Sequence, residues 1–168
     1  MRNLKDTLVS LYFQVTRREF VYSGTVSDFL KHDQLGVMKA ITFYNQWLYS
    51  MDVPRELKLI SYEQMHSDTQ GVLSQALDFI GVGNIDKDQV IKAVKKCEFE
   101  NMKRVELAHA GLRGPLAPGD PDDAESFKVR KGKVGNYRQY LSSEDIDYID
   151  NAIESMGCSL LKEMNAQY

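Results

Sequence analysis

One short apolar run constrains the fold of this 168-residue chain most, because it is the one segment typical of a β-strand. It covers residues 57–61, with the sequence LKLIS. A lone strand leaves its backbone N–H and C=O groups without partners, and a two-stranded ribbon is only marginally stable. The chain also begins at the entrance of a predicted helix, where a strand–turn–helix unit would place a preceding strand. We therefore expect an α/β sheet completed by a missing N-terminal portion or by a second chain.

Helical periodicity dominates the rest of the chain. Apolar residues recur three and four positions apart, and Ser, Thr or Asp caps precede several of these segments. The predicted helices cover residues 4–16, 25–31, 34–50, 68–81, 86–97 and 142–157. The fold class that we predict is therefore α/β, truncated at the N-terminus and predominantly helical in the part present.

The stretch over residues 111–123 is rich in proline and glycine, which predicts a long irregular loop. We do not interpret it as a domain linker, because the helices on either side still need each other for a core. A chain of 168 residues is long enough for one domain and too short for two comfortable ones. We predict a single, partial domain over residues 1–168.

Composition excludes several classes of function. The formal net charge of −3 does not suggest a nucleic-acid partner. No apolar run approaches the roughly 20 residues of a membrane span, so no membrane partner is expected. The two cysteines, Cys97 and Cys158, lie far apart without CxxC spacing, which fits a reducing cytoplasm. The Asp-rich segment 120–123 lacks the closing Glu of a Ca²⁺ loop, and we expect no metal.

Two cationic segments have the residue types that a bound phosphate needs. The first, RNLKDTLVS over residues 2–10, places Arg2 at a helix entrance and Ser10 about two turns later. Spacing alone leaves a surface Arg and a helix-facing Ser as an alternative. The second runs from Phe127 to Arg138 and contains RKGK over residues 130–133. Its cations and glycines could form an anion-binding nest or a solvated basic loop.

Two aromatic residues are candidates for contact with a ligand. Tyr62 follows the predicted strand, and ligands of open α/β sheets bind at the carboxyl ends of strands. Phe99 could stack on a base, although an aromatic residue at this spacing is more often part of the core. We interpret the three histidines as surface residues, because none has a carboxylate or Ser partner at motif spacing.

In their order along the chain these segments resemble the cytosolic-type sulfotransferases, from Arg2 to about Met156. That family has an Arg-Asn/Asp-x-x-Asp-x-x-x-Ser segment, which residues 2–10 match. Its most specific motif, Arg-Lys-Gly-x-x-Gly-x-Trp-Lys, is matched by RKGKVGNYR over residues 130–138. Further matching segments are FYNQWLYS (43–50), LISYEQM (59–65), DFIGV (78–82) and CEFENMK (97–103).

The resemblance implies a P-loop-like sulfotransferase fold and the co-substrate 3′-phosphoadenosine-5′-phosphosulfate. It implies that the 3′-phosphate is held by Arg2, Ser10, Arg130, Lys131 and Gly132, and that Tyr62 and Phe99 line the adenine pocket. The reaction would be sulfuryl transfer to the hydroxyl or amine of a small-molecule acceptor. Residues 136–138 (NYR) depart from the usual Asp/Asn-Trp-Lys, and Cys97-Glu98 replaces a Thr/Ser-Ser pair.

The family's loop for the 5′-phosphosulfate and its His base both precede the position that corresponds to Arg2. We therefore assign no catalytic residue in this chain and leave its status as an enzyme open. Three hypotheses follow. The chain is the C-terminal portion of an active sulfotransferase, a non-catalytic nucleotide-binding remnant, or a helical interaction module with vestigial motifs.

Overall fold

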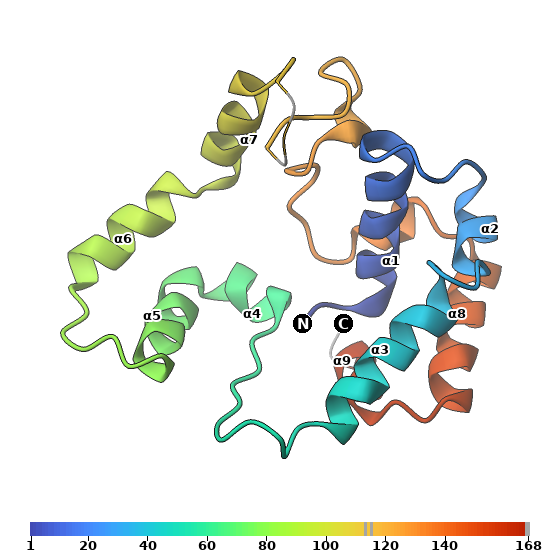
Figure 1. The fold of residues 1–168 in the computed structure, drawn as a ribbon, viewed down its shortest axis with the longest axis horizontal. Helices are drawn as coiled ribbons and strands as arrows, with labels where there is room; N and C mark the ends of the chain where they lie inside the picture. Colours follow the sequence, from blue (N-terminus) through green and yellow to red (C-terminus); the bar gives the residue numbers. More distant parts are fainter. Residues whose placement is uncertain (113, 115, 167–168) are drawn as a thin grey trace. The chain divides into compact units, whose positions relative to one another are not determined.

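The computed structural model describes residues 1–112, 114 and 116–166, together with the side chains of most of them (Figure 1). The chain forms two compact units. The core unit contains Arg2–Thr16, Phe20–Leu57 and Gly135–Tyr168. The loop unit contains Met1, Arg17–Glu19 and Lys58–Val134. Each unit is described below by itself.

The core unit is a set of helices around one apolar cluster. Its helices are α1 (Leu4–Phe13), α2 (Val26–Leu30), α3 (Val37–Tyr49), α8 (Ser143–Ser155) and α9 (Ser159–Ala166), with the 3₁₀ helix η3 (Asn136–Gln139). Helix α1 packs against α2 and η3, and α8 packs against α2, α3 and α9. The cluster includes Leu4 and Leu8 from α1, Ile41 from α3 and Ile149 from α8. Figure 1 shows α1 in blue and α8 in orange.

Local capping explains where these helices begin. The Asn3 side chain accepts hydrogen bonds from the backbone N–H groups of Lys5 and Asp6, which starts α1. Thr25 and Ser142 each form a reciprocal capping box with the residue three positions later, at the starts of α2 and α8. The sequence offers Ser142 or Ser143 as the cap of α8, and the structure shows that it is Ser142. A π-helix, η1 (Gln14–Arg18), extends α1 beyond the predicted end.

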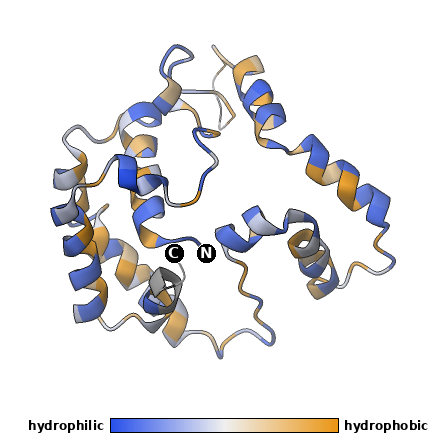
Figure 2. Cartoon of the chain, turned by 180° about the vertical axis from the view of Figure 1, so that it is seen from behind, coloured by the Kyte–Doolittle hydropathy of each residue, from blue (hydrophilic) through white to orange (hydrophobic). Residues whose placement is uncertain are grey.

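The described residues of the loop unit form four α-helices, joined by short connections. They are α4 (Tyr62–Ser67), α5 (Thr69–Phe79), α6 (Lys87–Lys96) and α7 (Phe99–Ala108), followed by the 3₁₀ helix η2 (Ala124–Ser126). Helix α5 packs against α4 and α6. The sequence offers Asp68 or Thr69 as the cap of α5, and the structure shows that it is Asp68. Gly81 follows the helix with φ +80°, where the sequence predicts its end. Figure 2 shows orange, hydrophobic segments alternating with blue ones along α6 and α7.

The prediction of a strand over residues 57–61 is wrong. None of the described residues, 1–112, 114 and 116–166, lies in a β-strand. The segment is extended, and its end pairs with Met1: the terminal ammonium donates to the Ile60 carbonyl at 2.6 Å, and the Tyr62 N–H donates to the Met1 carbonyl at 2.6 Å. Two hydrogen bonds to one residue do not make a ladder, and a strand needs neighbouring strands to persist. The described part is helical rather than α/β.

The long loop is irregular, as its prolines and glycines predict, although residues 113 and 115 lie outside the described part. After η2 the chain continues as the basic loop, which we define as residues 127–134. This loop has no regular secondary structure, in agreement with the sequence. It ends where the chain passes into the core unit at Gly135, whose φ of +75° favours glycine.

Candidate nucleotide-binding site

Two cations of the basic loop share one carboxylate. Arg130 Nη1 donates to Glu125 Oε2 at 2.7 Å, and Lys131 Nζ lies 3.1 Å from Glu125 Oε1. The Arg130 side chain is 10% exposed, whereas the Lys131 side chain is 37% exposed. Glu125 belongs to η2, directly before the loop. The donors that hold this carboxylate are of the kind that binds phosphate, so the donor set suits an oxyanion.

Gly132 lies directly against the ring of Phe99. Its φ is +58°, and a Cβ atom at this position would lie 2.5 Å from Phe99 Cδ2. Both the conformation and the space therefore require glycine here. The contact places the first residue of α7 beside the turn that follows the two cations. The structure thus brings Phe99, Arg130, Lys131 and Gly132 together within the loop unit.

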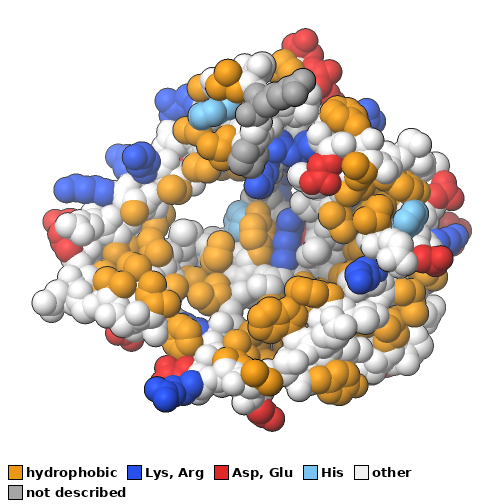
Figure 3. Space-filling model, in the orientation of Figure 1, with side chains coloured by type: hydrophobic (Ala, Val, Ile, Leu, Met, Phe, Trp, Pro, Cys, Tyr) orange, Lys and Arg blue, Asp and Glu red, His pale blue; other side chains and the backbone are white. Residues whose placement is uncertain are grey.

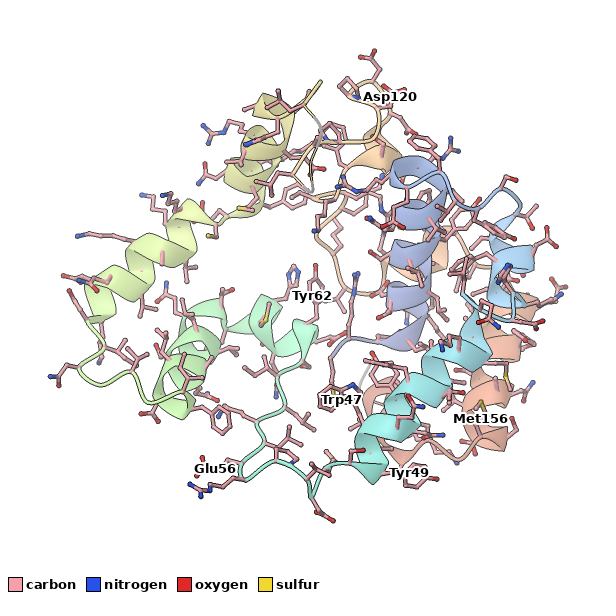
Figure 4. All side chains as sticks on the ribbon, in the orientation of Figure 1. Trp47, Tyr49, Glu56, Tyr62, Asp120 and Met156 are labelled. Atoms are coloured by element: carbon pink, nitrogen blue, oxygen red, sulfur yellow. The ribbon has the colours of Figure 1, made fainter. Side chains whose placement is uncertain are left out.

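Tyr62 is the first residue of α4 and is half-buried (Figure 4). Its ring packs edge-on against His66, with the ring centroids 4.5 Å apart. Ser61 caps the helix through a box with Gln64, which sets the direction in which the chain leaves the extended segment. The capped start of α4 therefore positions the Tyr62 backbone, and the contact with His66 positions its ring. Both belong to the same unit as the basic loop.

Arg2 and Ser10 belong to the core unit. Arg2 Nη2 lies 3.8 Å from Asp6 Oδ2, one helical turn away. Ser10 is exposed and lies four residues after Asp6, on the same side of α1. The guanidinium of Arg2 and the hydroxyl of Ser10 are therefore both associated with one side of this helix.

Two buried carboxylates contact the chain on either side of the cations, and sequence reasoning missed both. Glu106 on α7 is 3% exposed and accepts hydrogen bonds from the backbone N–H groups of Lys128 and Val129 at 2.6 and 2.8 Å. Asp6 on α1 is 2% exposed and accepts from the N–H groups of Gly135 and Tyr137 at 2.7 and 2.9 Å. The Asp within the Arg-x-x-x-Asp pattern is the one sequence signal that could have indicated Asp6.

The histidines have structural contacts. His32 packs edge-on against Tyr22, His66 against Tyr62, and His109 Nδ1 lies 2.7 Å from the carbonyl of Val105. Cys97 is exposed, Cys158 is buried, and both are free thiols. Within the described residues, no group of three or more His, Cys, Asp or Glu side chains could hold a metal ion. No helix in that part of the chain is long and apolar enough to span a membrane.

The sequence matches the sulfotransferase domain family over residues 1–165, and the chain therefore belongs to that family. The resemblance carried by the motifs is confirmed. The flavonol 3-sulfotransferase of Flaveria bidentis is 25% identical over 167 residues, covering 91% of this chain and 52% of its own length. Cytosolic sulfotransferase 12 of Arabidopsis thaliana is 28% identical over 159 residues, covering 91% of this chain and 47% of its own.

A solved structure shares the fold. The mouse sulfotransferase SULT7A1, complexed with PAP, superposes with a TM-score of 0.70 at 19% identity and covers all of this chain and 62% of its own. This likeness establishes the sulfotransferase fold for the described helices. The chain spans about half the length of the curated relatives named above, at 52% and 47%.

Proposed function

We propose that this chain is the part of a sulfotransferase that holds the 3′-phosphate end of 3′-phosphoadenosine-5′-phosphosulfate. The acceptor would be the hydroxyl or amine of a small molecule; the name flavonol 3-sulfotransferase, borne by one relative, supports a small molecule with hydroxyl groups. The bound PAP of the mouse structure supports a nucleotide of this kind. The proposal places the protein in the cytoplasm, because several relatives are named cytosolic sulfotransferases.

The observation that carries the proposal is the cation pair of the basic loop. Arg130 and Lys131 already hold an oxyanion, the Glu125 carboxylate, at 2.7 and 3.1 Å. A phosphate offers the same acceptor atoms with more charge, so it can replace this carboxylate. Gly132 would let the backbone N–H approach the phosphate, and Phe99, which contacts it, would stack on the adenine.

The remaining residues enter the proposal through the family motif. Arg2 would add a planar fork of donors, and Ser10 a hydroxyl, to the same 3′-phosphate. Tyr62 would line the adenine pocket. When bound, the co-substrate supplies the sulfuryl group; the residues named here bind and orient its far end. An active enzyme would also need a base and a 5′-phosphosulfate loop, to which no residue of this chain is assigned.

A titration with adenosine 3′,5′-bisphosphate tests the proposal, with adenosine 5′-monophosphate as the matched ligand. We expect calorimetry to show a clear preference for the bisphosphate. Arg130→Ala should weaken its binding by at least about 1.5 kcal/mol, as for a charged hydrogen bond. Glu125→Gln should strengthen it by about threefold, since a competing carboxylate is removed.

The control is Arg104→Ala, which removes an exposed arginine of α7 in the same unit and should leave both affinities unchanged. Equal binding of the two nucleotides by the wild-type chain would contradict the proposal. An unchanged affinity in Arg130→Ala would remove this residue from the site. A non-catalytic remnant would show the same preference, so the titration tests binding of the 3′-phosphate and not turnover.

A further inference from the structure

Glu106 is a buried carboxylate whose hydrogen-bond partners hold the entry to the basic loop. Its Oε1 accepts from the Lys128 N–H at 2.6 Å and its Oε2 from the Val129 N–H at 2.8 Å. Arg18 Nη1 donates to the same Oε1 at 2.8 Å and to the Ser126 carbonyl at 3.2 Å. The Arg18 and Glu106 side chains are both largely buried. A charge is buried at such a position only when it is paired and hydrogen-bonded.

These contacts determine how the chain enters the loop. The two N–H groups belong to the residues directly before Arg130. Because each residue has only two soft backbone torsions, fixing these two peptide groups sets the torsions of Lys128 and leaves only those of Val129 between the anchor and Arg130. Glu106 therefore controls the path of the backbone that carries the guanidinium of Arg130.

Asp6 makes the equivalent contacts after the loop, within the core unit. It accepts from the Gly135 N–H at 2.7 Å and from the Tyr137 N–H at 2.9 Å. Its carboxylate also lies 3.8 Å from Arg2 Nη2. Each carboxylate thus accepts hydrogen bonds from two backbone N–H groups and lies near an arginine.

We infer that Glu106 and Asp6 are positioning residues, which fix the chain before and after Arg130, Lys131 and Gly132 so that the loop is preorganised for the 3′-phosphate. The inference rests on the proposed function. A loop that is already ordered does not lose conformational freedom on binding, which raises affinity without a new contact to the ligand. The carboxylates themselves are unsuited to contact a phosphate, because like charges repel.

The sign of a mutational effect separates this role from simple electrostatics. Glu106→Gln removes a negative charge near an anion-binding loop, so electrostatics alone would tighten the binding of the bisphosphate. Gln keeps one acceptor oxygen and turns the other into an N–H₂ donor, which cannot accept the second backbone N–H. Positioning therefore predicts weaker binding, the reverse of the effect expected for Glu125→Gln.

The experiment titrates the full 168-residue chain with adenosine 3′,5′-bisphosphate and adenosine 5′-monophosphate. The variants are Glu106→Gln, Asp6→Asn and the control Glu100→Gln, which makes the same change at an exposed position of α7. We expect the first two to weaken bisphosphate binding by about fivefold or more. Monophosphate binding should change by less than about twofold in all variants, because this nucleotide has no 3′-phosphate. Loss of folded protein would instead lower both affinities alike.

Amide hydrogen exchange gives a readout that needs no ligand. In Glu106→Gln the amides of Lys128 and Val129 should lose protection, while those of Gly135 and Tyr137 keep it. Asp6→Asn should show the reverse pattern, and it serves as the second variant if Glu106→Gln does not fold.

The outcomes separate the inference from the proposed function. If the wild-type chain does not prefer the bisphosphate, the proposed function fails, and the exchange pattern alone decides whether the carboxylates anchor the loop. If the wild type prefers the bisphosphate and the two variants keep that preference, the positioning role is overturned. Tighter binding by Glu106→Gln would overturn it as well, in favour of electrostatics.

Discussion

The two units differ in how they are held together. The main apolar cluster lies entirely in the core unit, where residues such as Leu8, Ile41 and Ile149 are fully buried. Among the described residues of the loop unit, the buried apolar side chains are Val90 and Phe127. Large apolar residues of that unit are instead exposed, including Phe79, Ile80 and others on and around α5 and α6. Figure 3 shows orange side chains gathered over these two helices.

A cavity of about 410 Å³ between α5 and α6 adds to this contrast; it is lined by Leu73, Leu77, Val90 and Ala93, among others. Most of the favourable free energy of folding comes from apolar burial. The core unit therefore gains more of its stability from apolar burial, whereas the loop unit depends more on hydrogen bonds and ion pairs such as those of Glu106. Arg130 and Lys131 thus belong to the unit with the smaller core, where local polar contacts must keep them in place.

The largest difference between the two units is expected for a matched pair of leucine substitutions, one in each unit. Leu8→Ala removes a fully buried side chain of α1, and we expect it to lower the free energy of unfolding by about 3 kcal/mol. Leu107→Ala removes a side chain of α7 that is 45% exposed, and we expect a loss below about 1 kcal/mol. Denaturant unfolding followed by circular dichroism measures both. Equal losses would show that α7 is buried as deeply as α1.

A glycine pair tests whether tight local contacts replace a core in the loop unit. Gly132→Ala forces a Cβ against the ring of Phe99 at positive φ, which should cost about 2 kcal/mol and weaken bisphosphate binding. Gly81→Ala has a similar φ of +80° but nothing within 4 Å of its Cβ, so it isolates the cost of the conformation. Thermal unfolding and calorimetry should show the larger loss for Gly132→Ala. Equal effects would mean that contact with Phe99 is unimportant.

The smallest effect is expected at the start of α2, where a polar contact supplements the apolar core. Hydrogen bonds from the Thr25 side chain and backbone N–H lower the pKa of Asp28 from its ordinary value of 3.8. A lowered pKa stabilises the folded state above the ordinary value, and this contribution is lost as the pH falls through the lowered pKa.

The melting temperature of Asp28→Asn should therefore be slightly below that of the wild type at pH 7, and the difference should narrow in acid. The control Asp33→Asn changes an exposed aspartate of the next connection and should show no such narrowing. A difference that stays constant down to the acid limit would exclude the ionised carboxylate as its source.

Much of the helical structure could be predicted, because caps and periodicity act over a few residues. Helix α8 begins after Ser142 as predicted, and Gly81 and Gly157 lie at positive φ after α5 and α8. The sequence does not predict helices α4, α7 and α9. The apolar stripe of α5 predicted the helix correctly, although none of its residues is buried. Trp47 and Tyr49, on α3, are likewise exposed despite their size (Figure 4).

Some residues of the candidate site could likewise be predicted from the sequence, and others could not. Arg130, Lys131 and Gly132 could be identified from their order in a short motif, and Phe99 from a second motif. The contact between Phe99 and Gly132 joins residues 33 positions apart, and no local pattern announces it. Nothing in the sequence distinguishes Glu106 from other charged residues, because its partners at 128 and 129 are known only from the folded chain.

By itself, the sequence determined the family, the helices with strong caps and the cations that could meet a phosphate, since each depends on neighbouring residues or on a motif. The tertiary structure alone decided that residues 57–61 do not form a strand, that Arg130 and Lys131 share Glu125, and that Glu106 and Asp6 accept the backbone N–H groups around them. The physical reason is that burial and hydrogen-bond partners are properties of chain segments brought together by folding. A strand needs neighbouring strands, and a buried carboxylate needs donors, and neither requirement can be checked along the sequence.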